Sequence, residues 1–121
     1  MTISKQAALV RRLYEKTMAG QLDWKVAARD RAFQVSFSSY TVRLVEADDP
    51  DPNEEEPDYF IELINEDGDL ADGISYMDLK GSEGAPVNDN WWQTLRQIYS
   101  RARRTARGAD RALDTILKEL E

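Results

Sequence analysis

The chain has 121 residues, of which 41% are hydrophobic and 32% are charged, so it fits a single domain, residues 1–121, with one hydrophobic core. It contains neither cysteine nor histidine, which excludes disulfides, thiolate nucleophiles, ordinary zinc sites and every Ser-His or Cys-His catalytic arrangement. No apolar run approaches the ~18 residues that cross a bilayer, and the first residues lack the pattern of a signal peptide. We therefore expect a cytoplasmic protein without membrane contact.

The charges are sorted by segment. Residues 1–45 carry eight Lys/Arg and three acids, residues 46–89 carry one Lys and sixteen acids, and residues 90–121 carry seven Lys/Arg and four acids. The net charge is −7. Two basic ends around an acidic middle indicate a bipolar surface, whose halves can meet each other in a homodimer or meet a partner of mixed charge.

The first element is predicted to be an amphipathic helix over residues 4–19. Ser4 is a suitable N-cap, and Gly20 is a suitable C-terminal stop. The apolar positions recur at spacings of three and four, at Ile3, Ala7, Val10, Tyr14 and Thr17. The charged residues between them fall on the outer face of the helix.

Alternation of apolar and polar residues then predicts an antiparallel sheet of four to five strands. The expected strands are residues 24–28, 33–37, 40–46, 59–64 and 70–75. Ser38-Ser39 and residues 66–69 are the expected turns between neighbouring strands. With a helix at each end of the chain, this order predicts an α+β domain with both helices on one face of the sheet.

Residues 47–57 are predicted to form a mobile acidic loop, because they include three prolines and no apolar residue larger than alanine. Asp49, Asp51 and Asn53 match the first three ligand positions of an EF-hand. Glu54 and Phe60 occupy the sixth and twelfth positions, where a calcium loop needs Gly and Glu. No metal ion or other cofactor is therefore predicted, although weak binding of divalent cations by the loop stays open.

The C-terminal segment is predicted to be a long amphipathic helix of about 30 residues, spanning roughly 45 Å. Its apolar positions are Trp92, Leu95, Tyr99, Ala102, Ala106, Ala109, Leu113, Ile116 and Leu120. A five-stranded sheet is only ~24 Å wide, so a straight helix would overhang it. Two interpretations stay open: the helix bends or ends at Gly108, or the overhanging stripe dimerises.

Two apolar features are candidate partner surfaces. Val45, Phe60 and Ile64 fall on the strand faces opposite the main apolar set, where they could form an exposed patch. Trp91 and Trp92 point ~100° apart on a helix, so one of them is expected at a partly exposed groove edge. Trp91 is the member of the pair that we assign to a partner surface.

The arginines of the C-terminal helix, among them Arg103, Arg104 and Arg107, lie opposite its apolar stripe. A row of guanidinium groups is typical of phosphate binding and favours a nucleic-acid interface. The acidic net charge opposes such binding at long range. We therefore keep a nucleic-acid-binding regulator as the alternative interpretation.

Several short segments resemble those of a family of small uncharacterised bacterial proteins. They are residues 13–17 (LYEKT), 20–24 (GQLDW), 33–37 (FQVSF), 40–43 (YTVR), 64–68 (INEDG) and 109–114 (ADRALD). The resemblance covers most of the chain, but its motifs are structural and imply no activity. In layout alone, the order of elements is also similar to that of type III secretion chaperones, which are dimers that hold partially unfolded clients.

These observations favour a non-enzymatic protein-interaction module. A self-associating adaptor and a chaperone-like factor are the two forms considered for it. The overlong amphipathic helix and the absence of the commonest catalytic residue types carry this expectation. The sequence does not identify the partner.

Overall fold

The computed structural model describes residues 4–47 and 57–121, so the predicted acidic loop at 47–57 lies outside the described residues except for its ends. The elements are α1 (Lys5–Met18), β1 (Lys25–Val26), β2 (Ala32–Ser36), β3 (Tyr40–Glu46), β4 (Tyr59–Asn65), β5 (Leu70–Ser75), α2 (Tyr76–Leu79), α3 (Trp91–Ala106) and α4 (Ala109–Glu119). The strands form one antiparallel sheet in the order β1-β2-β3-β4-β5. Each strand therefore pairs with its neighbour in sequence.

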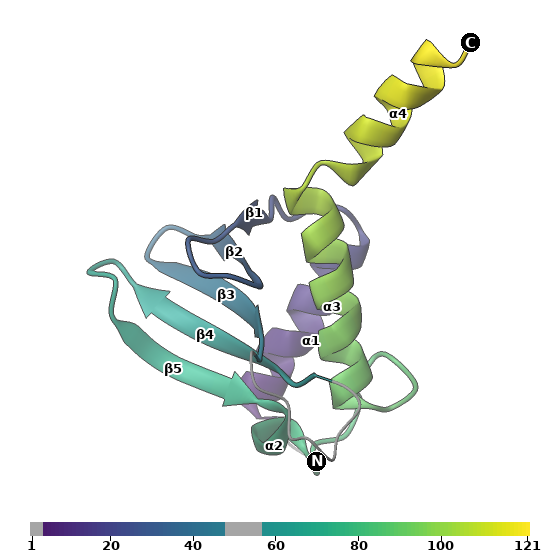
Figure 1. Cartoon of the computed structure of the whole chain (residues 1–121). Coiled ribbons are helices and arrows are strands. Elements are labelled where there is room, and N and C mark those ends of the chain that lie inside the picture. The colour runs from purple at the N-terminus through teal and green to yellow at the C-terminus, as the bar shows by residue number, and fades with distance from the viewer. Residues whose placement is uncertain (1–3, 48–56) are drawn as a thin grey trace.

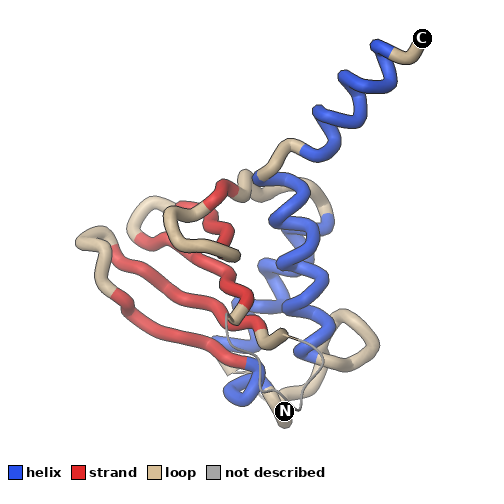
Figure 2. Tube along the Cα trace, viewed as in Figure 1, coloured by secondary structure: helices blue, strands red, loops and turns tan. Residues whose placement is uncertain are grey.

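Helices α1 and α3 pack side by side on one face of the sheet, as Figures 1 and 2 show. This arrangement confirms the predicted α+β fold. The core between the two layers is built from the apolar faces of all these elements. Its largest fully buried members include Trp24, Leu44, Ile61, Ile74, Leu79, Leu95, Ile98 and Val10.

The register of the strands places the apolar side chains on the helix-covered face. Leu44 of β3 lies opposite Phe33 of β2 and Ile61 of β4, and Ile61 lies opposite Ile74 of β5. Since directly opposed residues share one face of a sheet, these four side chains form a continuous row beneath the helices. A shift by one residue would turn the whole row toward the other face.

The sequence predicted most of these boundaries well. The third and fifth strands have the predicted bounds, and Phe37 N–H donates to the carbonyl of Tyr40 at 2.8 Å, which closes the predicted hairpin at Ser38-Ser39. Ser4 caps α1, because its Oγ accepts from the N–H of Ala7 at 3.1 Å. The short helix α2 was not predicted.

The C-terminal segment is helical, as predicted, and Gly108 divides it into two helices. Gly108 has φ 66° and ψ 37°, a left-handed conformation that favours glycine. Helix α3 ends just before it, and α4 leaves the body of the protein in a new direction (Figure 1). The helix therefore ends at Gly108, as the first of the two interpretations predicted, and dimerisation of the apolar stripe beyond it stays a prediction.

One buried hydrogen bond fixes the connection between α1 and the sheet. The indole Nε1–H of Trp24 donates to Oγ1 of Thr17 at 3.1 Å, and both side chains are buried. Thr17 lies in the last turn of α1, and Trp24 directly precedes β1. The bond satisfies the only polar group of a large apolar side chain inside the core.

Replacement of Thr17 by Val is expected to lower the free energy of unfolding by about 1–3 kcal/mol, because the Trp24 N–H would stay buried without an acceptor. In a Trp24→Phe background the same replacement should cost close to nothing, since no donor remains. Urea unfolding of the four proteins of this cycle measures both costs. Equal costs in the two backgrounds would show that the bond does not contribute.

Candidate functional site

Helix α4 carries a row of exposed apolar side chains, which we call the α4 apolar face: Leu113, Ile116, Leu117 and Leu120. Between 51% and 76% of each is exposed. At about 100° per residue they lie on one side of the helix. The structure describes all of α4, and none of its residues is buried. An amphipathic helix normally packs this side against a core, so the α4 apolar face is a candidate docking surface.

Acidic residues flank the α4 apolar face on both sides. Asp114 falls on one flank and Glu119 on the other, whereas Arg111 and Lys118 fall on the opposite side of the helix. Asp110 accepts from Arg104 of α3 across the break, with 3.2 Å between Arg104 Nη2 and Asp110 Oδ1. Both side chains are exposed, so this ion pair holds the direction of α4 only weakly.

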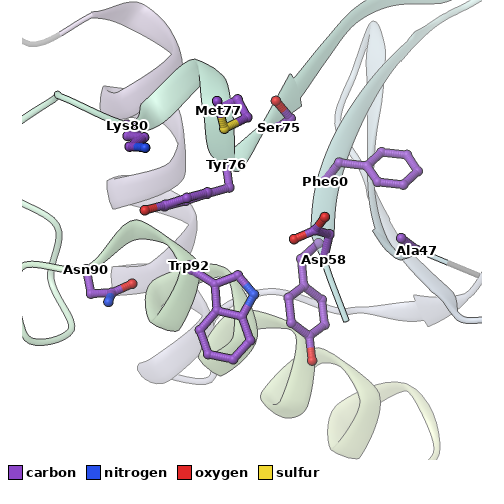
Figure 3. Close-up of a pocket in the computed structure, with 10 residues that line it drawn as sticks. Ala47, Asp58, Phe60, Ser75, Tyr76, Met77, Lys80, Asn90 and Trp92 are labelled. Atoms are coloured by element: carbon purple, nitrogen blue, oxygen red, sulfur yellow. The ribbon is translucent and has the colours of Figure 1, made fainter. Parts of the chain in front are cut away.

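The second candidate site is an open pocket of about 870 Å³ at the ends of several elements, which we call the aromatic pocket. Its walls combine aromatic, apolar and charged side chains, as Figure 3 shows. The lining residues are Ala47, Asp58, Tyr59, Phe60, Ser75, Tyr76, Met77, Lys80, Asn90 and Trp92. Met77 is 69% exposed and is therefore available for contact.

Hydrogen bonds at the ends of helices hold the pocket walls in place. The Trp92 indole Nε1–H donates to the carbonyl of Pro57 at 3.0 Å, and its ring lies 6.1 Å from that of Tyr59. Asn90 caps α3 by accepting from the N–H of Gln93 at 3.0 Å. Ser75 and Asp78 form a capping box at the start of α2. The walls are therefore largely preformed.

The charges of the aromatic pocket are of both signs. Lys80 and Asn90 stand on one side of the pocket, and Asp58 stands on the other (Figure 3). The guanidinium of Arg96 lies 5.5 Å from the centre of the Trp92 ring, at a distance typical of a cation–π contact. An apolar ligand with an acidic edge fits this arrangement better than a uniformly charged one.

The three predicted arginines come together where α3 ends. Arg103, Arg104 and Arg107 line a hollow of about 300 Å³ with Ser100 and Ala109. Two of the three side chains have contacts within this chain: Arg104 pairs with Asp110, and the Arg107 guanidinium lies 5.9 Å from the centre of the Phe33 ring. The row is therefore partly engaged before any ligand arrives.

Tyr99 lies beneath this basic row, and its ring contacts those of Phe33 and Tyr59. Burial raises the pKa of the Tyr99 phenol above its ordinary value of 10.0, and Glu46 adds to the rise. Arg103, Arg107 and Arg31 act in the opposite direction. Because burial dominates, the phenol stays protonated at neutral pH and serves the packing of α3 on the sheet.

The predicted patch of Val45, Phe60 and Ile64 is not a single exposed surface. Val45 is 0% exposed, because Ala27 and Ala32 pack around it on the face opposite the helices. Phe60 is partly buried against the same cluster, and the guanidinium of Arg29 lies 5.5 Å from its ring centre. Ile64 is partly exposed. The patch prediction is therefore wrong for Val45.

The exposed member of the tryptophan pair is Trp92, not Trp91. Trp91 is 4% exposed, and its Nε1–H donates to the carbonyl of Ser82 at 2.8 Å. Trp92 is partly buried and lines the aromatic pocket. The prediction that one of the two lies at a groove edge is confirmed, but its assignment to Trp91 was wrong.

Sequence reasoning missed Tyr76 and Met77, which reach the aromatic pocket from α2. A helix of four residues leaves no periodic signal, and only the sequence Ser75-Tyr-Met-Asp78, with a capping residue and an acid three positions later, could have indicated it. The apolar residues of α4 were found, as the overhanging end of the stripe that begins in α3.

No described helix has the length and apolar character needed to span a bilayer. Within residues 4–47 and 57–121, no three acidic side chains lie together in a way that could hold a metal ion. Comparison with protein-family models, with curated proteins and with solved structures finds no match to this chain. The surfaces described above are therefore the features of the molecule from which a function can be proposed.

Gly108→Ala is expected to join α3 and α4 into one straighter helix. Alanine disfavours the left-handed conformation and favours the helical one, each by roughly 1 kcal/mol. Among the described residues, no atom outside the adjoining backbone lies within 4 Å of the position of the added Cβ. Because the chain lacks cysteine, spin labels at Arg12→Cys and Lys118→Cys would report the new direction of α4 as a changed distance.

Gly20→Ala is the matched control, since Gly20 has φ 71° and equally open surroundings among the described residues, but no helix follows it. It should lower stability without changing the distance between the labels. An unchanged distance in Gly108→Ala would mean that something other than Gly108 sets the direction of α4.

Proposed function

We propose that this chain is a non-enzymatic protein-interaction module that docks α4 against another folded surface. The observation that carries the proposal is the α4 apolar face: four large side chains, each at least half exposed, on a helix that buries none of its residues. Burial of a Leu or Ile side chain contributes about 1.5–3 kcal/mol. Covering this face would therefore supply a substantial binding free energy.

The length of α4 supports the same conclusion. Eleven residues span about 16 Å, and isolated helices shorter than ~12–15 residues are marginal in water. The helix receives little support from the body of the protein beyond the Arg104–Asp110 ion pair. A partner that accepts an amphipathic helix in a groove would supply the missing packing.

The residue types of the chain support a non-enzymatic role. Without histidine or cysteine, the commonest general bases and nucleophiles of enzymes are absent from the whole sequence. A self-associating adaptor and a chaperone-like factor are both compatible with a docking helix. In either case α4 would be the part that meets the partner.

A nucleic-acid-binding regulator ranks second. The hollow lined by Arg103, Arg104 and Arg107 is the feature that would meet phosphates. Arg104 and Arg107 already contact Asp110 and Phe33, and the net charge of −7 opposes approach to a polyanion. These contacts favour the docking proposal over the phosphate-binding one.

Site-specific photo-crosslinking in the cells that produce the protein tests the proposal. A photoreactive amino acid at Leu117 should form discrete covalent adducts with a protein. The same group at Arg111, on the opposite side of α4, is the matched control and should form few. Equal or absent adducts at the two positions would contradict the proposal.

Leu117→Glu should weaken the docking of α4 without destabilising the protein. Because α4 adds nothing to the buried core, the free energy of unfolding should stay within about 0.5 kcal/mol of the unsubstituted value. In this variant the photoreactive amino acid is placed at Leu113 instead of Leu117. The discrete adducts that this position forms in the unsubstituted protein should be lost. Urea unfolding and the adduct pattern measure the two effects separately.

A further inference from the structure

We infer that the surface that covers α4 is the aromatic pocket of a second copy of this chain, so that two copies exchange their C-terminal helices. This inference rests on the proposed function and names the partner for it. Each copy carries both parts of the contact, an unpartnered apolar helix and an open pocket with apolar walls.

The size and chemistry of the pocket match the α4 apolar face. A volume of about 870 Å³ lies within the range of roughly 300–1,000 Å³ that compact ligands occupy, which leaves room for several aliphatic side chains. Phe60, Tyr76 and Trp92 supply aromatic walls, and the exposed Met77 supplies an adaptable one. Leu and Ile side chains entering this space would replace water against apolar surface.

The charges match on one side of the pocket. Asp114 falls on one flank of the α4 apolar face and Glu119 on the other, and Lys80 lies on one side of the pocket with Arg96 against Trp92. Docking that turns either flank toward Lys80 places opposite charges together there. The remaining acid then lies on the side of Asp58 (Figure 3), where both carboxylates are exposed and solvent screens their repulsion.

The area available favours an exchange over a pairing of two α4 helices. A stable interface buries about 800 Å² on each partner, and one pair of helices about 16 Å long and about 10 Å wide falls well short of it. A reciprocal exchange uses two helix–pocket contacts instead of one helix–helix contact. It also closes on itself as a two-fold dimer.

The sheet edge is a poor alternative surface for a second copy. At the β5 edge, Oδ1 of Asp72 accepts from the N–H of Gly73 at 2.9 Å, and Gln6 of α1 donates to Oδ2 of Asp72 at 3.2 Å. The Asp72 carboxylate thus already accepts from the Gly73 N–H, a backbone donor that an added strand would need. The opposite edge strand, β1, has only two residues.

Light scattering after size exclusion tests the assembly with the full chain. The unsubstituted protein should have the mass of two chains at high micromolar concentration. Leu117→Glu in the helix and Met77→Glu in the pocket should each raise the dissociation constant at least tenfold, because each places a charge in an apolar contact. Lys118→Glu, on the far side of α4, is the matched control and should leave it within about threefold.

Disulfide trapping shows which surfaces meet. Chains with Met77→Cys are mixed in a glutathione buffer with chains that carry one cysteine at Leu113, Ile116, Leu117 or Leu120. At least one mixture should yield a disulfide between the two different chains in preference to either homodimer. Chains with Lys118→Cys are the control and should yield little.

The outcomes separate the alternatives. A mass of one chain at every concentration overturns the inference, as does a dimer that Met77→Glu leaves intact or whose disulfides join α4 only to α4. A monomer that still forms Leu117 adducts with a different protein would retain the proposed function and replace the partner. Absence of every adduct would overturn both the proposed docking function and the exchange between two copies.

Discussion

The width of the sheet limits how much of the C-terminal segment can be buried. The end of α3 and the exposed position of α4 both follow from that limit. Helix α3 contacts β1, β2, β3 and β4, and its sixteen residues span about 24 Å, which is also about the width of five strands. Ala102 is its last buried residue. Beyond this point none of the described strands covers an apolar stripe, and the chain turns at Gly108 into a helix that stands outside the fold.

Local sequence patterns predicted the position of most strands. The burial of individual residues depends on tertiary packing, which these patterns do not contain. Alternation alone placed residues 40–46 and 70–75 in strands because each strand covers one core face. The burial of Val45 could not be read in this way, since Ala27 covers it from a different part of the chain. Trp91 and Trp92 differ by one position, and only the packed structure shows which of them faces the core.

The α4 apolar face shows a more general limit of sequence patterns. Its residues continue the periodicity of α3 without interruption, because a covering surface imposes the same spacing whether it belongs to the same fold or to another protein. The glycine at position 108 marks the point where burial of the stripe against this fold ends. Sequence reasoning recognised that residue but could not choose between a bend and a dimer, since Gly in a helical segment is compatible with both.

The joint at Gly108 has a consequence for the lifetime of any complex. Because α4 is not held by the core, docking must fix its direction and its exposed side chains, at roughly 0.5–1.5 kcal/mol for each side chain that is immobilised. That cost offsets part of the gain from burial and lowers the affinity per unit area. A complex built on α4 would therefore dissociate readily and exchange partners, while the body of the protein stays folded throughout.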